Sequence, residues 1–253
     1  MRDFLKKTIE EAGALGMSIF AEHVEYKEKT HRSDYVTRAD IEVSDFFVKK
    51  IGEKYPDHHI HTEEMAHDIN AGAEYEWVID PIDGTFNFAL GIPLWCILVA
   101  VVYKGETIYA GAYSPMSKDF FFAEKGKGTF FNDVLVHVNE QNDFANARGY
   151  VHISPGKDDI IDRHAQMLVH VIKEGARFMD QRDLYVACMV ADGKLDFYTS
   201  TSGKDHDHLA PKLILEEAGA IVTDSDGNTW QRGRSDIIAA NPVLHEKIIQ
   251  LLK

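Results

Sequence analysis

Apolar positions recur with two different periods along the chain, and these periods predict where helices and strands form. Residues 3–24 and 40–54 place apolar side chains at helical spacing among charged neighbours, which predicts two amphipathic helices at the start of the chain. Alternating aromatic and β-branched residues then predict a strand at 75–80 and β-rich segments at 94–103, 106–115 and 119–131. This part of the chain is therefore expected to form an antiparallel sheet.

After about residue 138 the pattern changes to helices interleaved with short strands. Helices are expected at 158–174, 183–192, 207–218 and 243–252, and strands at 195–199, 220–224 and 236–240. The fold class is thus α+β to α/β, with an N-terminal α+β lobe over 1–140 and a C-terminal α/β lobe over 141–253. Because no repeat or Gly/Ser-rich linker separates the lobes, we expect them to pack as one unit over 1–253.

The amino-acid composition limits the range of possible functions. The chain has 253 residues, of which 45% are hydrophobic, so it is long enough for a large core. Its formal net charge of −14 argues against a surface for nucleic acid polymers, since Lys and Arg supply most of that binding.

Cys96 and Cys188 lie in apolar runs and are interpreted as core residues. Residues 1–20 lack the apolar segment of a signal peptide and no run could span a membrane, so a cytoplasmic location is expected.

The strongest chemical signal is the stretch from Trp77 to Phe88, in which an apolar strand runs into a turn. Pro81 and Gly84 end the strand, so Asp80 and Asp83 are held where it emerges. Two carboxylates brought together need protons or cations to neutralise them, and oxygen ligands of this kind suit Mg²⁺. The alternative is an ordinary Asp-Gly turn that binds nothing.

Other acids occupy similar positions. Glu63 follows a short apolar strand and could join Asp80 on a shared ion. Asp40 stands at the start of the second helix, where a capping role for it or for Thr37 is the simplest interpretation. Asp207 precedes a helical run, where the helix dipole favours an acid. The neighbouring pair His206 and His208 is weak evidence for zinc, because a third ligand at fixed spacing is missing.

Taken together, five segments resemble the inositol monophosphatase family, the lithium-sensitive and Mg²⁺-dependent phosphatases, in order and spacing over nearly the full length. They are Asp34-x-Val36-Thr37-x-x-Asp40, Glu63-Glu64, Asp80-Pro81-Ile82-Asp83-Gly84-Thr85-x-Asn87-Phe88, Gly126-Lys127-Gly128 with Phe130, and Asp207 followed by Glu217-Ala218-Gly219. The resemblance implies a layered αβαβα sandwich of the inositol monophosphatase and fructose-1,6-bisphosphatase type. It also implies lithium inhibition and a homodimer.

The same resemblance implies a phosphomonoesterase that uses two to three Mg²⁺ ions. One ion would be bound by Glu63, Asp80 and the Ile82 carbonyl, and a second by Asp80, Asp83 and Asp207. Glu63 would also support a third, weaker ion. Asp40 and Thr85 match the pair that orients and deprotonates the attacking water, and the residues expected to contact the substrate are Asp83, Gly84, Thr85, Arg182 and Asp207.

The chain departs from the family pattern around the leaving alcohol. It has Asp180-Gln181-Arg182-Asp183 where a Gly-Ser-Ala-Ala run is usual, Thr199 where members selective for inositol phosphates carry Glu, His206 where Trp is usual, and Thr62 where Gly or Ser is common. Arg182 and Asp183 suit a polar or charged alcohol, or they pair with each other in solvent. The expected substrate is a small phosphorylated metabolite such as an inositol phosphate. Alternatives are fructose 1,6-bisphosphate, histidinol phosphate and nucleotide 3′- or 2′-phosphates.

Two other classes of protein compete with this interpretation. One is a family member that binds metal without catalysis, although every expected acid is present. The other is a haloacid-dehalogenase-type phosphatase with an aspartyl nucleophile, suggested by the Asp-Gly-Thr ending of the motif. That chemistry needs one residue between its two acids, whereas Pro81 and Ile82 make two.

Overall fold

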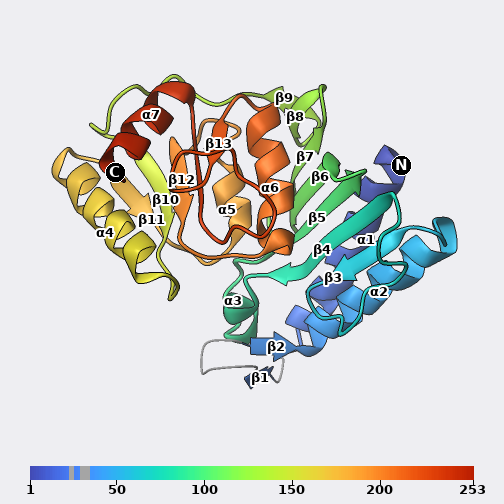
Figure 1. Ribbon diagram of the computed structural model, residues 1–253. Helices are drawn as coiled ribbons and strands as arrows, with labels where there is room; N and C mark the ends of the chain where they lie inside the picture. Colours follow the sequence, from blue (N-terminus) through green and yellow to red (C-terminus); the bar gives the residue numbers. More distant parts are fainter. Residues whose placement is uncertain (23–25, 29–34) are drawn as a thin grey trace.

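The computed structural model describes residues 1–22, 26–28 and 35–253, and these ranges form three sheets (Figure 1). A seven-stranded sheet has the spatial order β3 (His59–Thr62), β4 (Tyr75–Asp83), β5 (Cys96–Tyr103), β6 (Glu106–Ser114), β7 (Asp119–Glu124), β8 (Gly128–Phe131) and β9 (Val134–Val136). A five-stranded sheet has the order β11 (Arg177–Met179), β10 (Arg148–His152), β12 (Phe197–Ser200), β14 (Ile237–Ala240) and β13 (Ile221–Thr223). The third sheet pairs β1 (Tyr26–Glu28) with β2 (Tyr35–Thr37).

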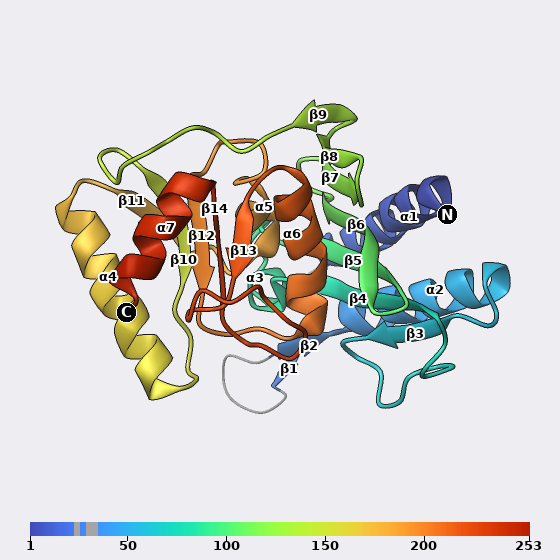
Figure 2. The ribbon, with the colours of Figure 1, turned by 45° about the horizontal axis from the view of Figure 1, so that its top comes forward.

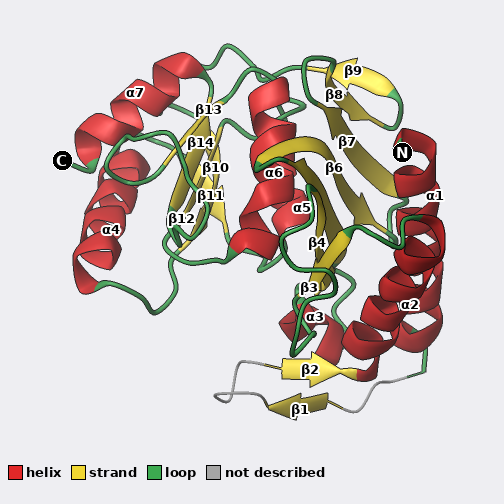
Figure 3. Ribbon diagram, turned by 45° about the vertical axis from the view of Figure 1, so that its right-hand side comes forward, coloured by secondary structure: helices red, strands yellow, loops and turns green. Residues whose placement is uncertain are grey.

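Helices cover and separate the two large sheets. The first pair, α1 (Arg2–Phe20) and α2 (Arg38–Lys54), packs on one face of the seven-stranded sheet. Between the sheets lie α5 (Leu184–Cys188) and α6 (Asp205–Glu217), and the outer face of the five-stranded sheet is covered by α4 (Asp158–Lys173) and α7 (Pro242–Leu251) (Figures 2 and 3). The predicted αβαβα sandwich is confirmed.

Strand β5 shows how the sequence specifies these layers. Its residues are buried on both faces, and they alternate between two cores. Cys96 and Leu98 join the core shared with α5 and α6, whereas Ile97 and Val99 join the core under α1 and α2. The apolar composition of this strand therefore follows from its central position in the sheet.

The structure corrects several predicted boundaries. The first helix ends at Phe20 instead of residue 24, and residues 23–25 lie outside the described ranges. The segment 119–131 forms two strands, because glycines with positive φ at 126 and 128 turn the chain between them. The seven-stranded sheet is not wholly antiparallel, since the long connection over 63–74 brings β4 back parallel to β3.

The C-terminal half also differs in detail from the prediction. Only 184–188 of the expected helix 183–192 is helical, and β10 and β11 lie in segments without a strong strand pattern. Residues 137–147 connect the two large sheets. The division into lobes at about residue 140 stays a prediction. In the described part of the chain, no helix is long and apolar enough to cross a membrane.

Candidate metal centre

A bulge at the end of β4 brings Asp80 and Asp83 to the same face of the sheet. Residues three apart on a regular strand point to opposite faces, because side chains alternate with a period of two. Here Asp80 pairs with Leu98 and Asp83 pairs with Cys96, so β4 has one residue more than β5 between these pairs. Pro81 lies in the bulge, where its missing N–H breaks no ladder bond. Both carboxylates therefore point to the side occupied by α6.

The third acid comes from the start of α6, more than a hundred residues further along the chain. Asp207 is in the first turn of this helix, and its Oδ2 accepts a hydrogen bond of 2.6 Å from the backbone N–H of Lys204. Asp207 therefore has the role at a helix start that the sequence predicts for it. Carboxylate oxygens of Asp80, Asp83 and Asp207 lie within 4.8 Å of one another, and we call these three residues the carboxylate cluster.

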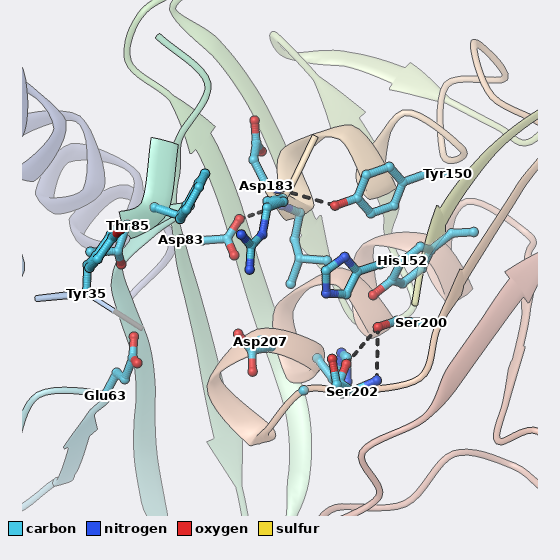
Figure 4. Close-up of a pocket in the computed structure, with 17 residues that line it drawn as sticks. Tyr35, Glu63, Asp83, Thr85, Tyr150, His152, Asp183, Ser200, Ser202 and Asp207 are labelled. Carbon is cyan, nitrogen blue, oxygen red and sulfur yellow. Dashed lines mark hydrogen bonds between the residues drawn. The ribbon is translucent and has the colours of Figure 1, made fainter. Parts of the chain in front are cut away.

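Glu63 approaches the cluster from the neighbouring strand. Because β3 and β4 are parallel, their carboxyl ends meet at one edge of the sheet, and the Glu63 N–H donates to the Ile79 carbonyl at 3.0 Å. Figure 4 shows Glu63, Asp83 and Asp207 around one cavity, with Thr85 beside them. Four of the five predicted metal-binding residues are thus close to each other, and the fifth, Ile82, lies between Asp80 and Asp83.

Burial in this region opposes ionisation. It raises the pKa of the Asp80 carboxyl well above its usual range, and the negative charge of Glu63 adds to the effect. Burial likewise raises the pKa of Asp83, with Asp183 as the next largest cause. Acids in such surroundings stay ionised only when a cation compensates them. The set of oxygen donors fits a hard divalent cation such as Mg²⁺.

One oxygen of Asp83 is fixed by the protein. Its Oδ2 accepts hydrogen bonds from the Leu184 N–H and from the Cys96 thiol, the latter at 3.2 Å. These bonds leave Oδ1 available for a cation. Both cysteines are buried and unpaired, which confirms that they are core residues.

Asp40 combines a capping role with a contact to the metal-binding turn. Its Oδ2 accepts from the N–H and the hydroxyl of Thr37, at 2.8 and 2.5 Å, which completes a capping box at the start of α2. Its Oδ1 accepts from the Thr85 hydroxyl at 3.0 Å. Burial raises the pKa of Asp40 to about 6, although the hydrogen bonds from Thr37 oppose the shift. The predicted cap is confirmed, while Asp34, the first residue of this motif, lies outside the described ranges.

Gly84 occupies the one position of the turn that excludes a side chain. Its φ of 91° is in the left-handed region, and a Cβ atom would lie 3.0 Å from the Leu94 carbonyl oxygen and 3.1 Å from that of Arg182. Helix α3 (Thr85–Ala89) starts directly after it. Gly84 and Thr85 both line the cavity, as does Asp83.

The opposite side of the cavity comes from the C-terminal half of the chain. Strand β10 pairs in parallel with both β11 and β12, so the carboxyl ends of the three strands meet at one edge. From this edge come residues that line the cavity, and we call them the strand-end wall: His152, Arg182, Tyr198, Ser200 and Ser202. The sequence pattern singled out only Arg182 among them, because no local motif marks the other four.

Arg182 and Asp183 do not pair with each other in solvent, so that alternative is wrong. Asp183 is buried and caps α5, with its Oδ1 accepting from the Tyr185 N–H at 2.8 Å. The guanidinium of Arg182 instead lies over the ring of Phe86, with its Cζ 4.4 Å from the ring centre.

Two other sequence signals have structural roles. Glu217 accepts hydrogen bonds of 2.9 Å from the backbone N–H groups of Gly126 and Gly128, and so joins the β7–β8 turn to α6. The buried His208 bonds to the Ser235 carbonyl at 3.1 Å, and His206 stacks on His61. Among the described residues, neither of these two histidines belongs to a cluster able to hold a metal, so the zinc alternative has no support.

Comparison with known proteins gives a consistent picture. The model of the inositol monophosphatase family matches residues 1–253. A Neisseria meningitidis serogroup B protein named as a putative Nus factor SuhB is 32% identical over 227 residues, covering 87% of this chain and 85% of its own. A Thermotoga maritima fructose-1,6-bisphosphatase/inositol-1-monophosphatase is 29% identical, covering 99% and 94%. The solved structure of a Thermotoga maritima IMPase, 28% identical, superposes with a TM-score of 0.89 and covers 99% and 95%.

Proposed function

Because the chain belongs to the inositol monophosphatase family, a family of metal-dependent phosphatases, we propose that it is a Mg²⁺-dependent phosphomonoesterase for a small phosphorylated metabolite. The observation that carries the proposal is the carboxylate cluster. Asp80, Asp83 and Asp207 come from distant segments, yet their oxygens lie within 4.8 Å of one another. Bringing three acids together, two of them buried, costs free energy, and a divalent cation is the partner that offsets the cost.

The residues that would hold the cations follow from this arrangement. Glu63, Asp80 and the Ile82 carbonyl would hold one ion, and Asp80, Asp83 and Asp207 a second. When bound, Mg²⁺ activates a water molecule as a nucleophile and stabilises the charge that develops on the phosphate and on the leaving alcohol. We expect two ions, with a third and weaker ion supported by Glu63. The same third ion is the basis for expecting lithium inhibition.

Thr85 and Asp40 are suited to take the proton from the attacking water. The Thr85 hydroxyl lies 3.0 Å from Asp40 Oδ1 and 2.9 Å from the Ile82 carbonyl, and with one proton it donates to one of them at a time. When the Thr85 hydroxyl donates to Asp40, a lone pair on its oxygen stays available to accept a hydrogen bond from the attacking water. The water proton moves to Thr85 as the Thr85 proton moves to Asp40, whose pKa of about 6 suits a base at neutral pH.

Backbone groups would position the phosphate. Gly84 and Thr85 line the cavity, and we expect their backbone N–H groups to donate to phosphate oxygens. As the water oxygen bonds to phosphorus, the bond from phosphorus to the alcohol oxygen breaks, and the alkoxide takes a proton from solvent. Asp83, Asp207 and Arg182 complete the proposed contacts with the substrate.

Several substrates remain in competition. An inositol monophosphate is the first candidate, while fructose 1,6-bisphosphate, histidinol phosphate and nucleotide 3′- or 2′-phosphates are alternatives. The Thermotoga relative is named for activity on both fructose 1,6-bisphosphate and inositol 1-monophosphate. We also expect a cytoplasmic homodimer, which sedimentation of the purified protein would test.

A second candidate function follows from the name of the meningococcal relative. A protein named as a putative Nus factor is 32% identical to this chain, so a role of that kind, with or without catalysis, is the alternative. The cluster favours the phosphatase, because Asp80, Asp83 and Asp207 are all present and close together. A protein that acted only by binding would have no need of this costly arrangement.

Phosphate release from a panel of phosphomonoesters tests the proposal. Turnover should require added Mg²⁺, disappear with a chelator, and disappear in Asp207→Asn. Isothermal calorimetry should show that the variant binds Mg²⁺ more weakly, while circular dichroism shows an unchanged fold. A folded wild-type protein that binds Mg²⁺ but hydrolyses no member of the panel would favour the binding role instead.

A further inference from the structure

The strand-end wall contains a cationic side chain, Arg182, that makes no direct ion pair with an acid of the described residues. Among the described residues the guanidinium of Arg182 forms no ion pair with a carboxylate and lies over the ring of Phe86. In a chain with a formal net charge of −14, an arginine beside an acidic site usually finds a carboxylate. The charge of Arg182 acts on the nearby Asp180 without a direct ion pair, so the guanidinium N–H groups are available to a ligand.

The backbone holds Arg182 in a costly conformation. Its φ of 54° lies in the left-handed region, which costs a residue with a Cβ atom about 1 kcal/mol. The Arg182 N–H donates to Asp180 Oδ1 at 3.2 Å, which stabilises the turn, and the stack on Phe86 holds the side chain. Phe86 is itself stacked on Tyr35, with ring centres 5.6 Å apart and planes at 6°. The side chain is thus oriented before a ligand arrives.

The same aspartate orients a second cavity residue. His152 Nδ1 lies 3.0 Å from Asp180 Oδ1 and 3.1 Å from Oδ2. Partial burial opposes ionisation of Asp180, but the hydrogen bonds and charge interactions with His152 and Arg182 together hold the Asp180 pKa below its usual range. An ionised Asp180 accepts from Nδ1, so Nε2 is the ring atom left for a ligand, and it donates to an oxyanion when the ring carries a proton on both nitrogens. Figure 4 shows His152 at the cavity beside Ser200 and Ser202.

Arg182 also lies close to the turn that would hold the scissile phosphate. Its carbonyl oxygen is 3.1 Å from the position of a Cβ on Gly84, and Phe86 follows Thr85 directly. Asn87 donates to both the Gln181 and the Leu94 carbonyls, at 2.6 and 2.8 Å, which locks the two loops together. A group that the leaving alcohol carries beyond the scissile ester would meet the strand-end wall.

We propose that Arg182 and His152 bind a second oxyanion on the leaving alcohol. The substrate class is then a phosphomonoester whose alcohol carries another phosphate or a carboxylate, in preference to a neutral polyol monophosphate. This inference rests on the proposed phosphatase function and narrows it. A guanidinium with free donors recognises either oxyanion by paired hydrogen bonds.

Matched substrate pairs test the inference. Fructose 1,6-bisphosphate and fructose 1-phosphate share one scissile ester and differ by the second phosphate, while 3-phosphoglycerate and glycerol 3-phosphate differ by a carboxylate. We expect wild-type kcat/KM to favour the charged member of at least one pair by about tenfold or more. The pair that shows the preference identifies the second anion.

Arg182→Gln should lower that preference by about tenfold. Arg182→Lys should keep part of it, because the charge remains without the planar fork. The control is Arg177→Gln, which removes the same charge from exposed β11 outside the cavity and should leave the preference unchanged. Melting temperatures of the three variants check that the fold is intact.

The outcomes separate the inference from the function on which it rests. If Arg182→Gln lowers kcat/KM equally for both members of a pair, Arg182 contacts the scissile phosphate and the inference is wrong. If wild type hydrolyses both members with no preference, the inference also fails while the phosphatase stands. If nothing is hydrolysed, the phosphatase fails, and calorimetry of fructose 1,6-bisphosphate against fructose 1-phosphate with Ca²⁺ still decides whether Arg182 binds the second anion.

Discussion

The carboxylate cluster and the strand-end wall face the same cavity but are built by opposite means. The cluster takes its side-chain oxygens from one strand and one helix, with Asp80 and Asp83 buried and Asp207 partly exposed. In the wall Arg182 is exposed and His152 partly exposed, and both depend on Asp180, while Arg182 also depends on the ring of Phe86. Buried acids with raised pKa values need a cation in every reaction cycle, whichever substrate is bound. An exposed arginine, in contrast, can favour some ligands over others.

This difference separates the reaction from the choice of substrate. Changes in the cluster should remove activity on every phosphomonoester. Changes in the wall should alter only the ranking of substrates. A cluster variant that changed selectivity but kept turnover would contradict this division.

The strongest test of the division is Asp83→Asn. We expect kcat to fall by about 10³-fold or more on every substrate, because the variant lowers the charge that attracts the cation. Leu184 and Cys96 can still donate to the retained side-chain oxygen, so the metal-free protein should melt at the same temperature or slightly higher. Phosphate release and a thermal melt check both parts, and retained Mg²⁺-dependent turnover would remove Asp83 from the metal site.

Asp40→Asn should have the next largest effect. The amide cannot accept a proton from Thr85, so kcat should fall by about 10²–10³-fold while Mg²⁺ binding changes little. Asp45→Asn on the exposed face of the same helix is the matched control, and it should behave as wild type. Equal losses in the two variants would show that the effect comes from helix charge and not from the contact with Thr85.

The carboxylate cluster is more predictable from the sequence than the strand-end wall is. The stretch from Trp77 to Phe88 predicts a strand, a turn and two acids within a few residues. The bulge that turns Asp80 and Asp83 to one face is not readable from a period of two, because it depends on pairing with β5. The wall is less predictable from the sequence. His152 and Asp180 come into contact only because β10 and β11 pair in parallel, and neither strand has a clear strand pattern in its sequence.

Burial of Asp183 shows the same limit. Next to Arg182 in sequence, it looks like half of a surface ion pair. In the structure it caps α5 and raises the pKa of Asp83, and burial raises its own pKa to about 6. Local pattern cannot distinguish a solvent-facing acid from one that is turned inward by the packing of two sheets.

The response of stability to pH and Mg²⁺ should distinguish the two sides of the cavity. Burial raises the Asp40 pKa from 3.8 to about 6, so between these values the folded state binds more protons than the unfolded state. This contribution to stability is present at low pH and is lost as pH rises through about 6. Asp80 and Asp83 act in the same direction.

Mg²⁺ binds the ionised acids, so its stabilising effect should grow with pH. At roughly thirty times its Kd it should add about 2 kcal/mol near pH 8, an increase in Tm of about 4–8 °C, and much less near pH 5. Taking the difference with and without Mg²⁺ cancels the titration of buried histidines elsewhere. Thermal melts across this pH range provide the measurement, and Arg182→Gln should leave the Mg²⁺ effect in place. A Mg²⁺ effect that is equal at both pH values would contradict the raised pKa values of Asp80 and Asp83.

The smallest expected effect concerns Glu217, a motif residue that belongs to neither side of the cavity. Its carboxylate accepts from the backbone N–H groups of Gly126 and Gly128, so Glu217→Gln loses one charge-assisted bond and should cost about 1 kcal/mol, or about 2–4 °C in Tm. Glu216→Gln breaks only a surface pair with Lys212 at 2.7 Å and should cost less than about 0.5 kcal/mol. Both variants should keep wild-type kcat and substrate preference. A loss of turnover in Glu217→Gln alone would show that the β7–β8 turn is coupled to Asp207 through α6, and the separation between structural motif and reaction site would then not hold.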